Sequence, residues 1–200
     1  MDDRRGHNLK QKRTFDQTVD LFDVRLPHEI EGRLGEIVAA ARIQPGQVVL
    51  DVGAGVGALI PHIQTFKPSR ILACDLSPRM LKRLKKKFPQ VETFLADVID
   101  IELPDGSLDA AFMNGMFSNI YDKPAALANL CRLLKPGGRM IVSHPEGRGF
   151  IVKLQAQVDF HLDPLPDEEE WLKLLEPFPL ESVYYLDAPR QFIAVARRTA

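Results

Sequence analysis

Short apolar runs alternate with amphipathic segments through the middle of the chain. Five runs of five or six residues are rich in strand-forming residues and occupy positions 48–52, 71–75, 91–96, 108–113 and 139–144. Segments with the helical spacing of apolar residues lie between them, at 57–66, 79–88 and 123–134. Strands that are apolar throughout and alternate with helices form mostly parallel sheets with helices on both faces. The pattern therefore predicts a doubly wound α/β fold.

The two ends of the chain follow different patterns. The first fifteen or so residues are basic and polar, and we expect them to form a mobile arm. One or two helices follow, because Ile30, Leu34 and Val38 keep a helical spacing that stops at Pro45. We expect one structural domain, in which residues 1–45 form the arm and a helical lid and residues 46–200 form the main body.

The C-terminal part predicts a helix and a hairpin. A helical pattern at 168–176 precedes two strand-like runs, at 181–187 and 192–198. No helix separates these two runs, so one of the strands must be antiparallel to its neighbour.

Composition and charge exclude several classes of protein. The chain has 200 residues, of which 45% are hydrophobic and 26% charged, as in an ordinary globular domain. Its net charge of −1 gives no general attraction to nucleic acid or anionic membranes. The N-terminus lacks the apolar core of a signal peptide, and no run approaches the roughly 18 apolar residues that span a bilayer. We expect a cytoplasmic protein without a membrane span, with Cys74 and Cys131 as reduced core residues.

The segment Val48–Ile63, VVLDVGAGVGALIPHI, joins a strand to a glycine-rich turn. In open α/β sheets ligands bind at the carboxyl ends of strands, where glycines let the backbone approach them closely. No lysine follows to complete a phosphate loop, and the dinucleotide pattern G-x-G-x-x-G is broken by Ala58. Asp51, just before the glycines, would repel a pyrophosphate and suits a ligand that carries an ammonium group.

Two further acids end neighbouring strands. Asp75 follows Gly57 by eighteen residues and can accept hydrogen bonds from both hydroxyls of a ribose, a role that dehydrogenases share. Asp97 follows the third strand and can accept a hydrogen bond from an adenine amino group. Simpler interpretations stay open: Asp51 as a helix-capping acid, and Asp97 as a loop acid that meets no ligand.

Four segments in this order, VVLDVGAGVG, ILACDLSPRML, FLADVIDIELPDGSLDAAFM and LLKPGGRMIV, resemble the class I S-adenosylmethionine-dependent methyltransferases. The resemblance covers about Gln47 to Val142. It implies a Rossmann-like, seven-stranded sheet with a reversed last strand, S-adenosyl-L-methionine as cofactor and S-adenosyl-L-homocysteine as product. The cofactor-binding residues that it implies are Asp51, Gly53, Ala54, Gly55 and Gly57 at the methionine end, Asp75 at the ribose, Leu76, Asp97 and Val98 at the adenine, and Asn114 beside the methionine part.

The methyl acceptor is constrained by residues that are missing. Transfer from a sulfonium mainly requires a well-placed nucleophile, so the family need not share a catalytic residue. Relatives that methylate amide or base nitrogens often carry Asn/Asp-Pro-Pro-aromatic after the fourth strand, whereas Met113–Asp122 has no proline pair. No cysteine lies in a strand-end loop, as cytosine C5 chemistry would need. We therefore expect a small-molecule acceptor, methylated on oxygen or carbon.

The segment Ser143–Phe150 is expected to open onto the same crevice. His144 is a candidate general base, and Arg148 is a candidate anchor for a substrate carboxylate or phosphate. Alternatively, His144 caps a strand end and Arg148 faces solvent. Phe15, His28 and His161 are further candidates for contact with substrate, and the histidines show no metal-binding spacing. No metal site is expected.

Other functions remain open. The apolar stripe of the helix at 79–88 leaves five basic residues outward: Lys82, Arg83, Lys85, Lys86 and Lys87. With the basic N-terminus they could bind nucleic-acid phosphates, although a solvated helix face explains them as well. The alternatives to a small-molecule methyltransferase are an RNA or protein methyltransferase, and a protein that binds S-adenosylmethionine or S-adenosylhomocysteine without catalysis. A nicotinamide-dependent oxidoreductase is opposed by the glycine spacing and Asp51.

Overall fold

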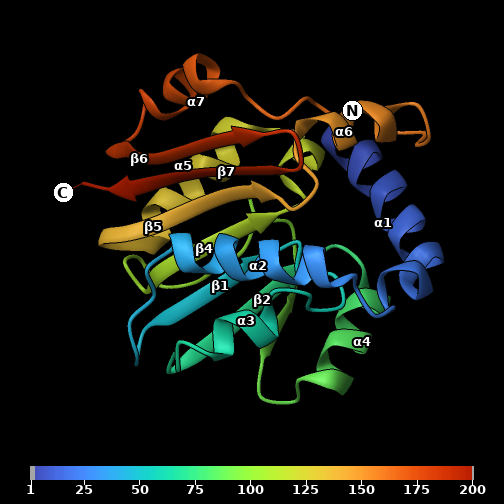
Figure 1. Ribbon diagram of the computed structural model, residues 1–200, viewed down its shortest axis with the longest axis horizontal. Coiled ribbons are helices and arrows are strands. Elements are labelled where there is room, and N and C mark those ends of the chain that lie inside the picture. Colours follow the sequence, from blue (N-terminus) through green and yellow to red (C-terminus); the bar gives the residue numbers. More distant parts are fainter. Residues whose placement is uncertain (1–2, 200) are drawn as a thin grey trace.

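A single mixed sheet forms the centre of the computed structural model, which describes residues 3–199 (Figure 1). The strand order is β3-β2-β1-β4-β5-β7-β6, and all neighbours are parallel except β7, which is antiparallel to both β5 and β6. This confirms the predicted seven-stranded sheet with one reversed strand. The strands are β1 Val48–Val52, β2 Arg70–Asp75, β3 Glu92–Leu95, β4 Leu108–Asn114, β5 Leu134–His144, β6 Leu180–Ala188 and β7 Gln191–Arg198.

Helices cover both faces of the sheet. They are α1 Asp3–Phe22, α2 His28–Ala40, α3 Ile60–Gln64, α4 Pro78–Lys87, α5 Lys123–Leu133, α6 Arg148–Gln155 and α7 Glu168–Leu175, with a short 3₁₀ helix at Phe117–Asn119. One core cluster joins α2, α3 and α4 to one face, and a second joins α5, α6 and α7 to the other. Alternate residues of the central strands feed these two clusters, so the strands are buried on both faces.

Local signals in the sequence explain where α4 begins. The hydroxyl of Ser77 accepts a hydrogen bond from the amide of Met80 at 3.1 Å, and Pro78 is the first helical residue. This cap fixes the start of α4 directly after the end of β2, so the Asp75 carboxylate and the helix N-terminus lie together.

Three segments differ from the sequence-based expectations. The expected mobile arm is wrong, because residues 3–22 form α1, which packs on α4. The helix expected at 57–66 is only Ile60–Gln64, because Gly57 has a left-handed φ of 91° that a helix cannot contain. Helix α6 was not predicted. Cys74 and Cys131 are free and buried, as expected.

No helix in the described part of the chain is both long and apolar enough to cross a membrane.

Candidate cofactor site

The carboxyl ends of β1 and β2 meet beside the glycine turn. β1 lies between β2 on one side and β4 on the other, which is the point where the strand order reverses. Crevices at this point are the usual ligand sites of open α/β sheets. The register pairs Val52 with Cys74 and Met113, so the residues that follow these three strands share one edge of the sheet.

The glycines of the turn have conformations and neighbours that exclude side chains. Gly53, Gly55 and Gly57 have φ values of 62°, 54° and 91°. A Cβ at Gly53 would lie 2.7 Å from the Met116 side chain, and one at Gly57 would lie 2.9 Å from the Phe88 ring. A Cβ at Gly55 would meet nothing within 4 Å. Gly55 therefore presents bare backbone to open space, as a turn that approaches a ligand must.

The rest of the turn is tied to β2. Ala54 is buried, and its amide donates to the carbonyl of Cys74 at 3.1 Å, while the amide of Gly57 donates to Ala54 at 2.9 Å. These bonds hold the turn against the end of β2.

Asp51 is a buried acid with an unusual pKa. Its side chain is almost fully buried, and burial together with the nearby Asp75 raises its pKa to about 8. None of the described residues donates a hydrogen bond to this carboxylate or forms an ion pair with it within 4.0 Å. A buried acid of this kind is stabilised in its charged form by a cation, and the ammonium group of a methionine fits that requirement.

Asp75 is held in place by backbone amides. Its two oxygens accept hydrogen bonds from the amides of Gly55 at 2.9 Å and Ser77 at 2.8 Å. Burial raises the pKa of this carboxyl group, although these hydrogen bonds act in the opposite direction. The carboxylate is therefore fixed between the glycine turn and the N-terminus of α4.

Asp97, Leu76 and Val98 line a small cavity together with Asp75 and Gly53. Its volume is about 40 Å³, far below the roughly 300 Å³ at the lower end of ligand pockets. The same cavity is lined by Asn8 of α1, whose side-chain amide donates to Asp97 at 2.6 Å. The crevice exists in the sequence-predicted place, but α1 covers it in this conformation.

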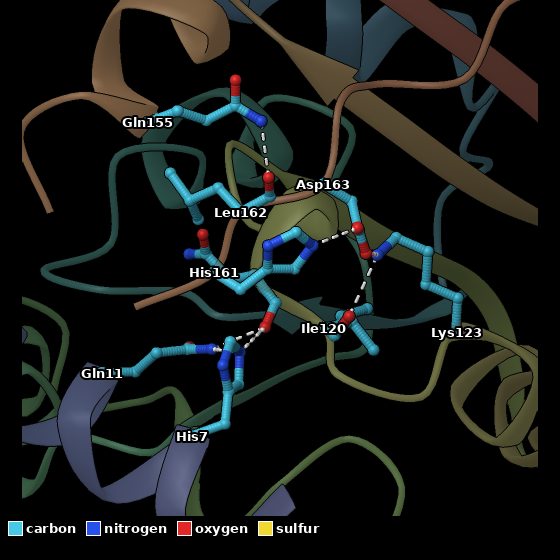
Figure 2. Close-up of polar contacts among 9 residues, drawn as sticks. His7, Gln11, Ile120, Lys123, Gln155, His161, Leu162 and Asp163 are labelled. Carbon is cyan, nitrogen blue, oxygen red and sulfur yellow. Dashed lines mark hydrogen bonds and ion pairs between the residues drawn. The ribbon is translucent and has the colours of Figure 1, made fainter. Parts of the chain in front are cut away.

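Several contacts hold α1 across the crevice. The side chains of His7 and Gln11 both reach the carbonyl oxygen of Asn119, at 2.9 and 2.5 Å (Figure 2). Further along the helix, Asp16 accepts a hydrogen bond from the Ser77 hydroxyl at 2.5 Å. Phe15, a candidate for contact with substrate, packs against Val56 of the glycine turn and Met80.

The basic residues of α4 face α1. Arg83 forms ion pairs with Asp20 at 2.9 Å and with Asp23, and Lys87 also pairs with Asp23. Asp16, Asp20 and Asp23 follow helical spacing, so one acidic face of α1 meets α4. Arg83 and Lys87 are thus paired within the molecule, and Lys85 donates to the carbonyl of Val91 at 2.7 Å, so three of the six basic residues of this helix are engaged. This weakens the phosphate-binding interpretation.

The loop between α6 and α7, which contains His161 and Asp163, lies beside α1 and the start of α5. Asp163 accepts from Lys123 and from His161, the latter at 2.7 Å, and Gln155 donates to the carbonyl of Leu162 at 2.6 Å (Figure 2). The side chain of His161 is 76% exposed, and its Nε2 contacts the Asp163 carboxylate. His28 is exposed at the start of α2, and neither histidine lines the cavity.

The geometry does not support His144 as a general base. Burial lowers the pKa of this imidazole to about 4, and its ring stacks on Phe150 with 4.9 Å between centroids. Its Nδ1 accepts a hydrogen bond from the amide of Glu146 at 3.1 Å. The neutral ring then carries its hydrogen on Nε2, and its basic nitrogen, Nδ1, is occupied by the Glu146 amide, so the ring is a weak base in this conformation.

Arg148 is also engaged elsewhere. It begins α6, and its guanidinium pairs with Asp187 of β6 at 3.0 Å. It does not line the cavity at Asp97, and the ion pair removes the free charge that a substrate anchor requires. Asn114, in contrast, ends β4 as expected, and its side-chain oxygen accepts from the Ser143 hydroxyl at 3.0 Å, which leaves the amide hydrogens free to donate.

Sequence reasoning missed Asn8, Gln11 and Met116. Asn8 and Gln11 lie on a helix of low hydrophobicity that resembles a solvated arm, and Met116 lies in an irregular loop. One signal was present: the acidic spacing of Asp16, Asp20 and Asp23 matches a helix that faces a basic partner.

The sequence of the chain is similar to those of known methyltransferases. Residues 50–142 match the methyltransferase domain family. The chain is 33% identical over 113 residues to demethylmenaquinone methyltransferase of Paenarthrobacter aurescens, covering 54% of this chain and 44% of the relative. It is 31% identical over 136 residues to malonyl-[acyl-carrier protein] O-methyltransferase of Halorhodospira halophila, covering 65% and 46%. The chain spans about half the length of these two curated relatives.

Solved structures share the fold over almost the whole chain. A SAM-dependent methyltransferase from Aquifex aeolicus has a TM-score of 0.73 at 20% identity, covering 92% of this chain and 98% of the other. Magnesium protoporphyrin IX methyltransferase from Synechocystis, solved with bound S-adenosylhomocysteine, has a TM-score of 0.74 at 18% identity, covering 96% and 100%.

The sheet order and these matches define the fold as that of the Rossmann-like methyltransferases. Over residues 50–142 the chain is similar in sequence to the methyltransferase domain family. The solved neighbours of this fold include S-adenosylmethionine-dependent methyltransferases.

Proposed function

We propose that the protein transfers a methyl group from S-adenosylmethionine to a small-molecule acceptor. The observation that carries the proposal is the buried Asp51 carboxyl group, which has no cationic partner among the described residues and lies beside the left-handed glycines at the end of β1. An ammonium group is the ligand that this carboxylate lacks. The cofactor supplies an activated methyl group on a sulfonium.

The chain's own residues supply the rest of the cofactor site. Asp51 and the backbone of the glycine turn hold the amino-acid end, together with the free amide hydrogens of Asn114. Asp75, fixed by two amides, accepts the ribose hydroxyls. Asp97 accepts the adenine amino group, and Leu76 and Val98 line the adenine position.

Cofactor binding requires α1 to move. Asn8 now donates to the Asp97 oxygen that the adenine amino group would use, and the remaining cavity of about 40 Å³ is too small for the cofactor. Asn8 and adenine therefore compete for the same acceptor. After α1 moves, its contacts to Asn119 and Ser77 are broken or rearranged.

The acceptor is proposed to react through oxygen or carbon. The loop after β4 lacks the proline pair of many amide and base N-methyltransferases. Relatives named for demethylmenaquinone and malonyl-[acyl-carrier protein], and a structural neighbour named as a geranyl diphosphate C-methyltransferase, support this class of acceptor. Since burial and the hydrogen bond from Glu146 make His144 a weak base, the proposed acceptor is a nucleophile that needs no strong protein base, or one that loses its proton to solvent.

Cofactor binding can be tested by calorimetry with S-adenosylmethionine, S-adenosylhomocysteine and NAD. We expect binding of the first two and none of NAD. Asp75→Ala should weaken binding by about 10- to 150-fold, since a hydrogen bond to a charged group contributes about 1.5–3 kcal/mol. Asp105→Ala, in a turn outside the site, is the matched control. NAD binding without S-adenosylmethionine binding would contradict the proposal.

Turnover requires a separate experiment. Metabolite fractions, total RNA and a cell protein fraction are incubated separately with the protein and methyl-labelled S-adenosylmethionine. Label transferred to a small molecule supports the proposed acceptor class, and label in RNA or protein would replace it with the macromolecular alternative. Cofactor binding with no transfer to any fraction would favour a non-catalytic binding protein.

A further inference from the structure

A second concave surface lies over β5, β7 and β6, away from the cofactor crevice at the ends of β1 and β2. Arg139 and Arg197 lie at the end of the sheet opposite the crevice, and the surface extends along β7 to Ile193, which pairs with Ser143. It has a volume of about 490 Å³, which is within the range of about 300–1,000 Å³ typical of small-molecule sites. It is lined by residues of α2, β5, β6 and β7 and of the turn after α2: Glu36, Ala40, Arg42, Arg139, Val183, Tyr184, Leu186, Ile193 and Arg197. We call this surface the arginine groove. Arg139 pairs with Ala110 near the start of β4, whereas the crevice lies at the other end of that strand.

The groove occupies a part of the sheet that lacks a helical cover. In Figure 1, β6 and β7 are seen with no helix in front of them, on the side where α2 crosses β4. Ile193 and Leu186 face this side and belong to the α2 cluster. The apolar floor of the groove is thus an extension of the core that the described helices do not cover.

A bulge in β6 adds to the apolar wall. The register between β6 and β7 shifts between Ser182 and Tyr184, so Val183 is an extra residue. In a regular strand Val183 and Tyr184 would face opposite sides, but at this bulge both line the groove. They are 37% and 46% exposed, so a large apolar and aromatic surface is available to a ligand.

The charges of the groove are unbalanced. Arg197 pairs with Glu181, but Arg42 and Arg139 have no carboxylate within 4.0 Å among residues 3–199. Arg139 is half-buried, and the only hydrogen bond that its guanidinium forms with residues 3–199 is a long one of 3.4 Å to the Ala40 carbonyl. Burial and the two neighbouring arginines lower the pKa of its guanidinium. Glu36 is the one acid in the wall, against three arginines.

The position of Arg42 is set by an unfavourable backbone conformation. This residue follows α2 with a φ of 52°, in the left-handed region where glycine or asparagine usually ends a helix. The strained arginine brings a third guanidinium to the groove.

We propose that the arginine groove binds a small amphipathic anion, a molecule in which a carboxylate, phosphate or sulfonate is joined to a flat apolar body. The anionic group forms charge-assisted hydrogen bonds with Arg42 and Arg139. The apolar body packs on Tyr184, Val183 and Leu186. The site is separate from the cofactor crevice and is independent of the proposed methyl transfer.

The probe for this proposal is 2-naphthoate, with uncharged 2-naphthalenemethanol as the matched neutral compound, each titrated into the full chain by calorimetry. We expect one naphthoate per chain, weaker binding at high salt, and little binding of the alcohol. Saturation with S-adenosylhomocysteine should leave naphthoate binding unchanged. Equal binding of the two compounds, or loss of naphthoate binding in the presence of S-adenosylhomocysteine, would overturn the proposal.

Variants locate the site. Arg42→Gln with Arg139→Gln should weaken naphthoate binding about tenfold or more, and Tyr184→Ala should weaken it several-fold. Glu36→Gln should strengthen binding, because it removes the only acid of the wall. Arg79→Gln, an exposed arginine of α4, is the control and should have no effect. The naphthoate affinity of the double arginine variant is compared with that of the wild type only if its melting temperature and S-adenosylhomocysteine affinity are retained. If they are not, the affinities of Glu36→Gln and Tyr184→Ala test the proposal.

Sedimentation of the wild-type chain and of the same variants tests for a different occupant of the groove, a second copy of the chain. Sedimentation of the wild-type chain should show no self-association that depends on the groove. A dimer that Tyr184→Ala or the double arginine variant dissociates would assign the groove to a second copy of the chain and overturn the small-molecule proposal.

Discussion

The carboxyl group of Asp51 lies in surroundings that raise its pKa to about 8. Below this pH the group is mostly protonated, whereas the ammonium of the cofactor favours the carboxylate. Binding therefore releases a proton, and we expect the affinity for S-adenosylhomocysteine to rise as the pH is increased from 6 toward 8. Above about 8 the affinity should fall again, because an α-amino group loses its own proton in that range.

Calorimetry across this pH range measures the effect, and buffers with different ionisation enthalpies report the released proton. Asp51→Asn should bind more weakly and should lose the rising limb of the profile. A rising limb of the same size in Asp51→Asn would show that another group titrates.

The same residue makes the cofactor-free protein less stable at higher pH. An unfolded aspartate has a pKa of about 3.9, so between that value and about 8 the native state binds more protons than the unfolded state. The contribution of Asp51 to the free energy of unfolding is fully present below pH 3.9 and is lost as the pH rises through 8. Urea denaturation at pH 5 and pH 8 should show a larger loss for the wild type than for Asp51→Asn. An equal loss in both proteins would contradict the buried, unpaired state of this acid.

At the scale of single elements, α1 competes with the cofactor through one side chain. The Asn8 amide lies 2.6 Å from Asp97, and its removal eliminates a hydrogen bond that binding must break. Asn8→Ala should strengthen S-adenosylhomocysteine binding by about tenfold, the lower end of the range for a hydrogen bond to a charged group, because in the wild type water replaces part of the broken bond. Gln17→Ala removes an exposed amide from the same helix and is the control. Weaker binding in Asn8→Ala would mean that Asn8 holds the cofactor rather than excluding it.

At the scale of the whole molecule, α1 should open independently of the sheet. It contributes Val19 to a small cluster with Val56 and Met80, whereas β4 and β5 are buried in the two main cores. Hydrogen exchange should therefore be faster in α1 than in β4. Replacing Arg83 and Lys87 by glutamine removes the ion pairs to α1 and should speed exchange in α1 alone. Lys82→Gln, on the exposed side of α4, should leave both rates unchanged.

The sequence predicts the sheet and the shared edge at which Asp51 and Asp75 lie because both depend on local patterns. The apolar runs before Asp51 and Asp75 mark strands, and parallel strands bring their carboxyl ends to one edge. The position of α1 could not be predicted in this way. Its contacts join residues about 60 to 110 positions apart, such as Asp16 with Ser77 and Gln11 with Asn119, and its polar residues gave no helical hydrophobic stripe. His144 shows the same limit, because its burial and its bond to Glu146 depend on how β5 and α6 pack.

The contact between Asn8 and Asp97 also bears on product inhibition. S-adenosylmethionine and S-adenosylhomocysteine carry the same adenine, so in the proposed binding mode each displaces the Asn8 amide from the Asp97 carboxylate. The free energy needed to move α1 therefore weakens the binding of S-adenosylmethionine and of S-adenosylhomocysteine by an equal factor. It cancels from the ratio of their dissociation constants. Mutations in α1 should change the concentration of S-adenosylmethionine that saturates the protein. They should leave unchanged the ratio of its dissociation constant to that of S-adenosylhomocysteine, because the two molecules differ only at the sulfur.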